Sequence, residues 1–536
     1  MTGDLIFMEA KQIIEGGTAI LGIEFGSTRI KSVLTDASHN ILATGIYDWE
    51  NSLVDGIWTY PMDEIMKGMR GSYASLAADV KEKYQTSIKK LSAIGISAMM
   101  HGYLPFDKDG KQLAEFRTWR NTMTAEAAGV LSKEFNFNIP QRWSIAHLYQ
   151  AILSGESHVK DISFLTTLAG YIHFRLTGEK NMGVGEASGM FPIDPATCDY
   201  DEKMIASFDA LIADKGFSWK IKDILPKVLK AGEKAGCLTA DGAALLDESG
   251  ELQAGAVFAP CEGDAGTGMC ATNAVKPGTG NISAGTSVFS MVVLDKNLGK
   301  PHEEIDVVTT PEGLPVAMVH CNNCSSDINA WVKLFADFAK VMGLEVNVGD
   351  IYTKLFTDAY KNGAKDCGGV LSINYFSGEP VTGLVNGRPM VVRTPDADFS
   401  MANFMRSNIY SAFATLKYGN DILSREENVK TEVMMAQGGL FKTPLAAQQM
   451  LADALDCPVT VPDTASEGGA WGMAVLAAFV LNKENGESLG DYLEKKVFSG
   501  QGQKTLNPDP EGVKGFDIYL DGYKKALKAE KIVADS

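Results

Sequence analysis

The sequence predicts an α/β protein of two lobes, and three observations support this prediction. The chain has 536 residues, which is more than one hydrophobic core normally serves. Its 45% hydrophobic and 22% charged residues are ordinary values for a globular protein. A strand–turn–strand pattern occurs twice, about half the chain length apart, so that one copy opens each half. We therefore expect lobes of residues 1–257 and 258–536.

The repeated pattern is a β-hairpin with glycine at its turn. Residues 23–34 read IEFGSTRIKSVL, and residues 282–293 read ISAGTSVFSMVV. Each has a short apolar strand, a glycine with two hydroxyl residues, and a strand rich in β-branched and apolar residues. Such a turn exposes backbone N–H groups together with hydroxyls, which can hold an anion without a basic side chain. The turn residues are Gly26, Ser27, Thr28, Gly285, Thr286 and Ser287.

The remaining elements fit two α/β lobes. Residues 91–99 and 431–436 are apolar and predict buried strands. Residues 103–255 are mostly helical in period and would elaborate the first lobe. Residues 508–536 end in a lysine-rich amphipathic helix with one solvated face.

A third glycine turn follows the strand expected near residue 436. The sequence AQGGLFKTPLAAQQM places Gly438 and Gly439 before a helix that we expect to begin with Thr443 as N-cap and Pro444 at N1. Bare glycines before a helix allow a flat or anionic ligand to lie on the backbone. Alone, this pattern is an ordinary strand–loop–helix crossover. Together with the two hairpins it favours nucleotide binding.

Charge and composition exclude other classes of protein. The net charge of −18 argues against sequence-independent binding to nucleic acid or to an acidic membrane, because both require a basic face. The longest apolar run, residues 471–481, is too short to cross a bilayer. The N-terminus lacks the basic start of a signal peptide. Eight scattered cysteines are typical of the cytoplasm.

Two further motifs are weak. Cys321 and Cys324 form a CxxC beside His320, but a zinc site usually needs a second pair, so we expect partly buried thiols instead. The segment GTGMCA at residues 266–271 matches the dinucleotide pattern G-x-G-x-x-G/A. A hairpin follows it where that pattern requires a βαβ unit and an acid, so a dehydrogenase is not favoured.

Five segments, taken in order, resemble the FGGY carbohydrate kinases, a branch of the actin-like ATPase superfamily. They span residues 22–455 and read GIEFGSTRIKSV, GISAMMHGYLPFDKDG, EGDAGTGMCA with GNISAGTSVF, NYFSGEP, and AQGGLFKTPLAAQQMLADAL. The triplet Met100-His101-Gly102 is most similar to xylulokinases. The resemblance implies two RNase H-like lobes, with ATP, Mg²⁺ and a sugar bound in the cleft between them.

The resemblance also implies roles for individual residues. Asp264 would be the catalytic base that takes the proton of the acceptor hydroxyl, and it would also contact the sugar. From the residues alone, Asp264 could also be the N-cap of a helix at 265–275, and the two roles are compatible. Glu24 stands where the family usually has Asp and would contact the metal through water. The two hairpin turns would bind the phosphates of ATP, and Gly438, Gly439 and Thr443 would line the adenosine side.

Met100, His101 and Trp119 match sugar contacts of the family. Here the chain reads TWRN, whereas the family commonly has an acid two residues after the tryptophan. Asn121 removes that charge and Arg120 adds a positive one. The altered pocket could prefer another ketose, a polyol or an acidic sugar derivative.

We expect a cytoplasmic, ATP- and Mg²⁺-dependent sugar kinase that acts on a ketopentose such as xylulose or ribulose. A kinase for another polyol, ketose or sugar acid is the first alternative. A nucleotide-binding pseudokinase or regulator is the second, because Glu24 and the TWRN segment depart from the family pattern. A homodimer is compatible with the sequence, which does not fix the oligomeric state.

Overall fold

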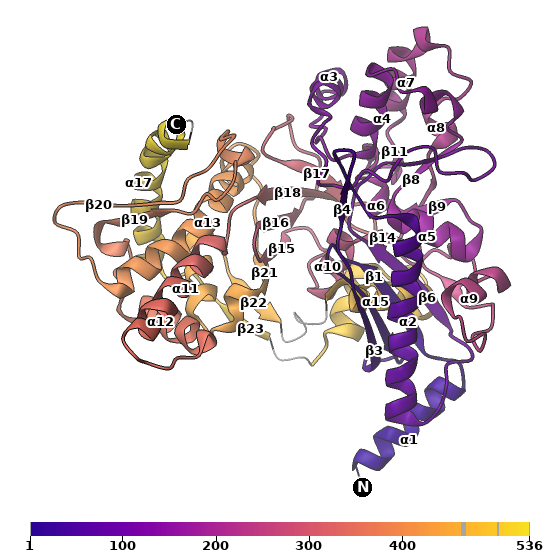
Figure 1. Cartoon of the computed structure of the whole chain (residues 1–536), viewed down its shortest axis with the longest axis horizontal. Helices are drawn as coiled ribbons and strands as arrows, with labels where there is room; N and C mark the ends of the chain where they lie inside the picture. The colour runs from indigo at the N-terminus through magenta and orange to yellow at the C-terminus, as the bar shows by residue number, and fades with distance from the viewer. Residues whose placement is uncertain (1, 463–467, 501–502, 535–536) are drawn as a thin grey trace. The chain divides into compact units, whose positions relative to one another are not determined.

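The computed structural model describes residues 2–462, 468–500 and 503–534 (Figure 1). The chain forms two compact units, each made from several segments of the sequence. Unit 1 contains residues 1–275, 307–316 and 467–500, and unit 2 contains residues 276–306, 317–466 and 501–536. The division expected after residue 257 assigned Asp264 to the second lobe. Asp264 belongs to unit 1, because the strand before it, β14 (Glu262–Gly263), pairs with a strand of the first sheet.

The central sheet of unit 1 is built from β1 (Ile20–Phe25), β2 (Arg29–Thr35), β3 (Ile41–Asp48), β6 (Ala93–Ala98), β13 (Val257–Phe258) and β14. Its order is β13-β6-β1-β2-β3, and β14 also pairs with β6. β1 runs antiparallel to β2 and parallel to β6. All but one of the β1 side chains are buried, because helices cover both faces of the sheet.

Those helices are α2 (Met62–Tyr84) and α15 (Gly468–Asn482). A Cβ at Gly22 would lie 2.1 Å from the backbone of α15, and a Cβ at Gly45 would lie 2.1 Å from the backbone of α2. Ser32 pairs with both Ile23 and Gly45, so Gly45 and Gly22 face opposite sides of the pleated sheet. The close approach of both helices explains a glycine inside each strand.

Short elements decorate this sheet. They are α1 (Thr2–Glu15), β4 (Ser52–Val54), β5 (Ile57–Thr59), β7 (Leu104–Phe106), α3 (Ala125–Phe135), α4 (Ser144–Leu153), β8 (Phe164–Thr166), α5 (Leu168–Thr177), β9 (Asn181–Gly183), α6 (Val184–Ala187), β10 (Ile193–Asp194), β11 (Asp199–Tyr200), α7 (Glu202–Leu211), α8 (Ile221–Ile224), β12 (Lys227–Leu229), α9 (Ala240–Leu246), α10 (Asp264–Ala271) and α16 (Leu489–Tyr492). The region 103–255, expected to be mostly helical, therefore contains six short strands as well, which pair within it.

Unit 2 has its own sheet and core. Its elements are β15 (Thr279–Ala284), β16 (Val288–Val293), β18 (Pro315–Cys321), α11 (Ser326–Val341), α12 (Val348–Asn362), β19 (Val370–Ile373), β20 (Met390–Arg393), α13 (Met401–Arg425), β21 (Val433–Gly438), α14 (Ala446–Leu455), β22 (Val459–Pro462), β23 (Gln503–Leu506) and α17 (Pro510–Ala534). A further strand, β17 (Asp306–Thr309), falls mainly among residues 307–316 of unit 1. The central strand order is β18-β16-β15-β21-β22-β23.

The core of unit 2 contains the long helix α13 and one face of α17. Phe516, Tyr519 and Tyr523 of α17 are buried, whereas Lys525 and Lys528 are exposed. The amphipathic C-terminal helix predicted from the sequence is therefore confirmed.

The repeated hairpin is also confirmed. β15 runs antiparallel to β16 and parallel to β21, as β1 does with β2 and β6. In unit 1, Phe25 at the end of β1 pairs with Ala98 at the end of β6. In unit 2, Ala284 at the end of β15 pairs with Gly438 at the end of β21. In both units, therefore, the hairpin turn and the loop after the neighbouring parallel strand leave the sheet at the same edge.

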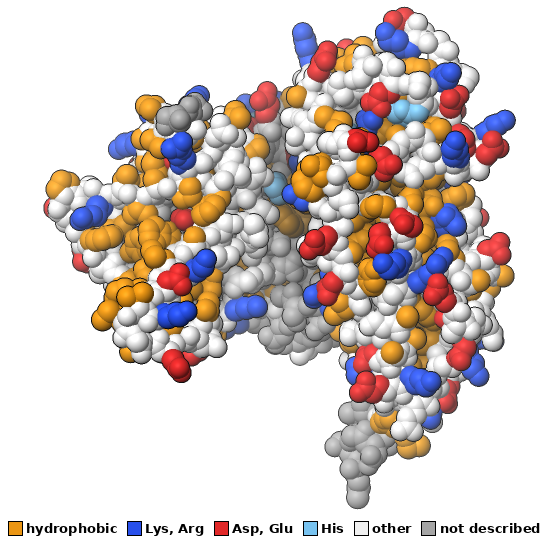
Figure 2. Space-filling view, viewed as in Figure 1, with side chains coloured by type: hydrophobic (Ala, Val, Ile, Leu, Met, Phe, Trp, Pro, Cys, Tyr) orange, Lys and Arg blue, Asp and Glu red, His pale blue; other side chains and the backbone are white. Residues whose placement is uncertain are grey.

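Acidic and basic side chains are interspersed over the visible face of unit 1 (Figure 2). The apolar run 471–481 lies inside α15, where residues 471–479 are buried. Among the described residues, no helix combines the length and the apolar character that a membrane span requires.

Candidate functional site

Asp264 is the first residue of α10, at the point where β14 ends. The N-cap of α10 is Gly263, so the N-cap role considered for Asp264 is wrong. Its Oδ1 instead accepts two backbone hydrogen bonds, from the N–H groups of Met100 and Ala265, both 3.0 Å long. The Met100 bond connects the loop after β6 to the start of α10, and it fixes one carboxylate oxygen. The side chain itself is exposed.

Glu24 is the second acidic residue of this region. It is half-buried on β1, and burial together with the nearby charge of Asp264 raises its pKa to about 7. A Cβ at Gly469 would lie 2.2 Å from Glu24 Oε1, so the glycine at the start of α15 makes room for this carboxyl group. The pKa of Asp264 is also raised, because surrounding protein atoms desolvate its carboxyl group although the side chain reaches solvent, and its two backbone N–H donors oppose the shift.

Two further carboxyl groups were not predicted as part of this region. Glu262 lies in β14, two residues before Asp264, and Glu186 lies in α6. Both are completely or almost completely buried. Burial raises the pKa of Glu262 to about 8 and that of Glu186 well above its usual range. The available sequence signal was that each acid is surrounded by glycines, in GVGEASG and CEGDAG.

The first predicted phosphate turn, residues 26–28, is held from beneath by aromatic side chains. The indole N–H of Trp49 donates to the carbonyl of Gly26 (2.7 Å), and the hydroxyl of Tyr60 donates to the carbonyl of Ser27 (2.6 Å). The rings of Trp49 and Tyr60 stack with centroids 4.2 Å apart. The carbonyl oxygens of Gly26 and Ser27 are therefore bonded within the protein. The N–H groups of Ser27 and Thr28 donate to no other described residue.

The second predicted turn, residues 285–287, is arranged in the same way within unit 2. Ser325 donates to the carbonyl of Gly285 through its N–H (3.2 Å) and its hydroxyl (2.6 Å). The N–H of Cys324 donates to the carbonyl of Thr286 (3.0 Å). In the described part of the chain, the N–H groups of Thr286 and Ser287 likewise have no acceptor. Each unit thus presents a short loop with outward N–H donors.

Cys321 and Cys324 belong to unit 2, and both side chains are buried. Cys324 contacts the second turn through its backbone N–H. Both are free thiols, and burial raises the pKa of each. No group of three metal-binding side chains occurs among residues the structure describes. We expected partly buried thiols, but both side chains are almost completely inaccessible, with Cys321 0% and Cys324 1% exposed.

Gly438 and Gly439 lie beside the second turn. Gly438 has a φ of 116°, and a Cβ there would lie 2.1 Å from the carbonyl oxygen of Ala284, so only glycine fits. A Cβ at Gly439 would meet nothing within 4 Å. The helix start predicted at Thr443 is wrong: a 3₁₀ turn covers Gly439–Lys442, and α14 begins at Ala446. Leu445, with a φ of 69°, takes the N-cap position and delays the helix.

Of the predicted sugar contacts, Met100 bonds Asp264 through its N–H, and His101 follows it in the chain. His101 is buried, adopts a φ of 72°, and has its Nδ1 3.3 Å from the carbonyl of Gly189. A positive φ at a residue other than glycine is costly and is commonly found at functional sites. Trp119, in contrast to the buried Met100 and His101, is 37% exposed and lies on the loop after β7.

The two residues after Trp119 have separate tasks. Asn121 is buried and bonds both the N–H and the carbonyl of Trp58, so it fastens the loop to β5. Arg120 is exposed, with its guanidinium 4.1 Å from the ring centroid of Trp58, and it donates to Asn51 Oδ1 (3.0 Å). Arg120 forms no ion pair with a carboxylate in the described ranges.

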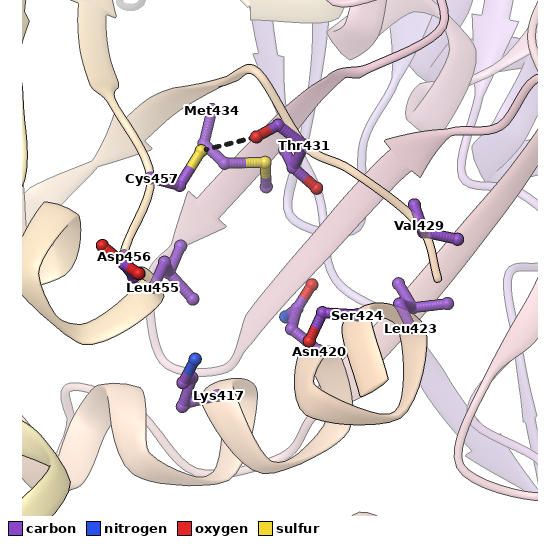
Figure 3. A pocket seen from close by; sticks show the side chains of 10 residues that line it. All are labelled: Lys417, Asn420, Leu423, Ser424, Val429, Thr431, Met434, Leu455, Asp456 and Cys457. Atoms are coloured by element: carbon purple, nitrogen blue, oxygen red, sulfur yellow. Dashed lines mark hydrogen bonds between the residues drawn. The ribbon is translucent and has the colours of Figure 1, made fainter. Parts of the chain in front are cut away.

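Two cavities lie within unit 2, and none of the predicted site residues lines either of them. One, of about 210 Å³, lies between Lys417, Thr431, Met434 and Cys457 (Figure 3). Met434 lies near the beginning of β21 and Thr431 lies two residues before it, whereas Gly438 ends the strand. Ligands of α/β sheets bind beyond the carboxyl ends of the strands, so this cavity lies at the opposite end of β21 from the nucleotide site that the sequence predicts. The other, of about 400 Å³, is apolar and lies between α11 and the start of α13.

Comparison with known proteins identifies two family models. The N-terminal domain of the FGGY family of carbohydrate kinases matches residues 19–265, and the C-terminal domain of that family matches residues 280–481. The xylulose kinase of Haemophilus influenzae is 23% identical over 81% of this chain and 83% of its own length.

Solved structures share the fold. A ligand-bound xylulose kinase from Lactobacillus acidophilus has a TM-score of 0.76 at 16% identity, with 96% of this chain and 99% of that chain covered. A gluconate kinase from the same organism also scores 0.76, at 17% identity and the same coverage. The two-unit α/β fold of actin-like ATPases that the sequence predicted is thereby confirmed.

Proposed function

Because the chain belongs to the FGGY family of carbohydrate kinases, we propose that it transfers the γ-phosphoryl group of ATP to a hydroxyl of a ketopentose such as xylulose or ribulose. The main observation that supports this proposal is the geometry of the Asp264 carboxylate. Its Oδ1 is occupied by two backbone N–H groups, which leaves Oδ2 to orient the acceptor hydroxyl and to take its proton. Phosphoryl transfer depends mainly on alignment and charge stabilisation, and a carboxylate fixed at one oxygen suits that task.

The phosphate groups of ATP would bind to the two loops with outward N–H donors. The loops are residues 26–28 and 285–287, and in each the carbonyls are held by the protein while two N–H groups have no acceptor among described residues. Gly438, Gly439 and Thr443 would line the adenosine side. Met100, His101 and Trp119 would contact the sugar.

Glu24 is the residue that fits Mg²⁺, through a bound water. A carboxylate oxygen is a suitable partner for this hard cation, which keeps several waters when it binds. A cation nearby would also favour the ionised form of Glu24, which burial and Asp264 disfavour. When bound, Mg²⁺ would neutralise part of the negative charge of the ATP phosphates.

A panel of ketoses, polyols and sugar acids in a coupled ADP-release assay tests the proposal. We expect turnover with a ketopentose, and Asp264→Asn should lower kcat by about 10²–10⁴-fold, the usual contribution of a general base. Asp36→Asn is a matched control, because Asp36 is a half-buried turn residue of unit 1 that also accepts backbone N–H groups. Wild-type kcat in Asp264→Asn would refute the assignment of the base. ATP binding without turnover on any sugar would favour the pseudokinase alternative.

Arg120 favours a second candidate, a kinase for a sugar acid. Its guanidinium is held flat by Trp58 and Asn51 and is not neutralised by a carboxylate among the described residues, so it is prepared to bind an oxyanion bidentately. One fold neighbour is a gluconate kinase. If the acceptor is acidic, Arg120→Gln should lower kcat/KM for gluconate by about 10–100-fold and leave that for xylulose unchanged. The control is Arg175→Gln, since Arg175 also stacks over an aromatic ring, that of Tyr171.

The eight cysteines are all free, which supports a reducing compartment such as the cytoplasm. The homodimer remains a prediction that sedimentation of the purified protein would test.

A further inference from the structure

Glu186 and Glu262 are buried acids that take no part in the mechanism described so far. Glu262 is 1% exposed and directly precedes Gly263 and Asp264 in the chain, and Glu186 is fully buried in α6. A buried carboxyl group is costly unless it serves as a partner for other polar groups. Glu262 accepts backbone hydrogen bonds, whereas both carboxyl oxygens of Glu186 are buried without a hydrogen-bond partner among the described residues, so Glu186 acts through packing.

Glu262 fastens the strand that leads to Asp264 onto the segment before α6. Its carboxyl oxygens accept from the N–H of Glu186 (2.9 Å) and the N–H of Gly185 (3.4 Å). A backbone bond from Gly183 N–H to the carbonyl of Cys261 (2.8 Å) runs beside them. A Cβ at Gly185 would lie 2.4 Å from Glu262 Oε2, and the three atoms nearest to that position all belong to Glu262. The glycine is thus needed for the carboxyl group.

Glu186 lies against the same backbone from the other side. A Cβ at Gly263 would be 2.5 Å from Glu186 Oε2 and 2.9 Å from Met100 Cγ. Glu186 therefore packs over Gly263 and close to Met100, the residue whose N–H donates to Asp264 Oδ1. Glu262 thus binds the backbone of α6, and Glu186 of α6 in turn packs against the residue that precedes Asp264.

We propose that Glu262 and Glu186 are positioning residues, which hold the Asp264 carboxylate and the backbone of Met100 in the orientation needed for phosphoryl transfer. This inference rests on the proposed function of Asp264. Burial raises the pKa of both acids, so near neutral pH they support the site as uncharged groups. An uncharged support adds no negative charge beside a base that must itself be ionised.

The substitution Glu262→Ala separates positioning from substrate binding. With the best sugar of the panel, we expect kcat to fall about 10–100-fold, because a shift of about 1 Å in a reacting group has that effect. KM for the sugar and for ATP should stay within about twofold of wild type. Glu262→Gln keeps an uncharged acceptor for the Glu186 N–H and should restore kcat to within about threefold.

Enlarging residue 185 and shortening residue 262 tests the packing of the Glu262 carboxyl group against Gly185. Gly185→Ala alone should lower kcat, because its methyl group displaces Glu262. In a Glu262→Ala background the same change should have a much smaller effect, since the three atoms nearest to that Cβ position all belong to Glu262. Asp247→Ala is the matched control: Asp247 is a buried acid of unit 1 that accepts the N–H groups of Ser249 and Leu252. It should lower Tm and leave kcat unchanged.

Amide hydrogen exchange supplies a measurement that does not need turnover. Glu262→Ala should lose protection at the amides of Gly185, Glu186 and Met100. If wild type phosphorylates no sugar but this protection is lost, the proposed function fails and the structural part of the inference stands. A folded Glu262→Ala with wild-type kcat would overturn the inference, as would a Glu262→Gln variant as slow as Glu262→Ala.

Discussion

Glu24, Glu186 and Glu262 keep their protons at pH values where an exposed carboxyl group has lost its own. Burial is the main cause for each, and it raises the pKa to about 7 for Glu24 and about 8 for Glu262. In the unfolded chain these groups titrate near 4.5. Between that pH and about 8 the folded protein binds more protons than the unfolded chain. The free energy of unfolding therefore decreases as the pH rises through this interval.

Glu262→Gln should reduce this pH dependence. At pH 5 Glu262 is already protonated in the folded wild type. Replacing it with the uncharged glutamine therefore does not increase the free energy of unfolding at this pH. From pH 5 to pH 8 the stability of the variant relative to wild type should rise by about 2–4 kcal/mol. Denaturant unfolding at several pH values measures this change, and the Asp247→Asn variant is the control. Parallel pH profiles for Glu262→Gln and wild type would contradict the raised pKa.

At the scale of elements, the first phosphate turn depends on the aromatic pair beneath it. Tyr60→Phe removes the hydroxyl that binds the Ser27 carbonyl at 2.6 Å and preserves the ring stacked on Trp49. We expect a loss of about 1 kcal/mol in stability and a rise in KM for ATP, because the loop is less well ordered before binding. Tyr84→Phe removes a similar bond, to the carbonyl of Leu42 (2.9 Å), and should leave KM for ATP unchanged.

The junction of β15 and β21 gives a second prediction at this scale. Gly438→Ala places a methyl group 2.1 Å from the Ala284 carbonyl at a φ of 116°. Strain and overpacking together should destabilise the protein by about 2–4 kcal/mol. Gly439→Ala meets no atom within 4 Å and should alter stability by less than about 0.5 kcal/mol. Equal effects of the two substitutions on Tm would show that the close approach at Gly438 does not occur.

The hairpins could be predicted because their pattern is local: glycine, two hydroxyl residues and flanking apolar strands lie within twelve residues. The start of α14 could not, because Thr443 and Pro444 have the right chemistry for a helix start and the 3₁₀ turn before them overrides it. Glu186 and Glu262 were missed for a different reason. They meet only in the fold, from segments 76 residues apart, and an acid that is buried has no periodic signal.

At the scale of the whole molecule, unit 1 is completed by a segment from near the end of the chain. α15 covers β1 and β6, where it lies 2.1 Å from a Cβ position at Gly22 and 2.5 Å from one at Gly95. A fragment of residues 1–275 would expose that face of the sheet. We expect it to aggregate or to lack a cooperative thermal transition, as measured by solubility and circular dichroism. Adding residues 276–536 as a second chain should restore both properties, and a stable monomeric fragment would contradict the role of α15.

The same return of the chain affects how the protein is made on the ribosome. All strands of the first sheet have left the exit tunnel soon after residue 263, but α15 begins only at Gly468. At about 5–20 residues per second, the sheet waits about 10–40 s for the helix that covers one of its faces. During that interval an apolar surface is open to other nascent chains and to chaperones. Codon changes that slow translation between these two points should therefore lower the yield of active protein more than equal changes after residue 482.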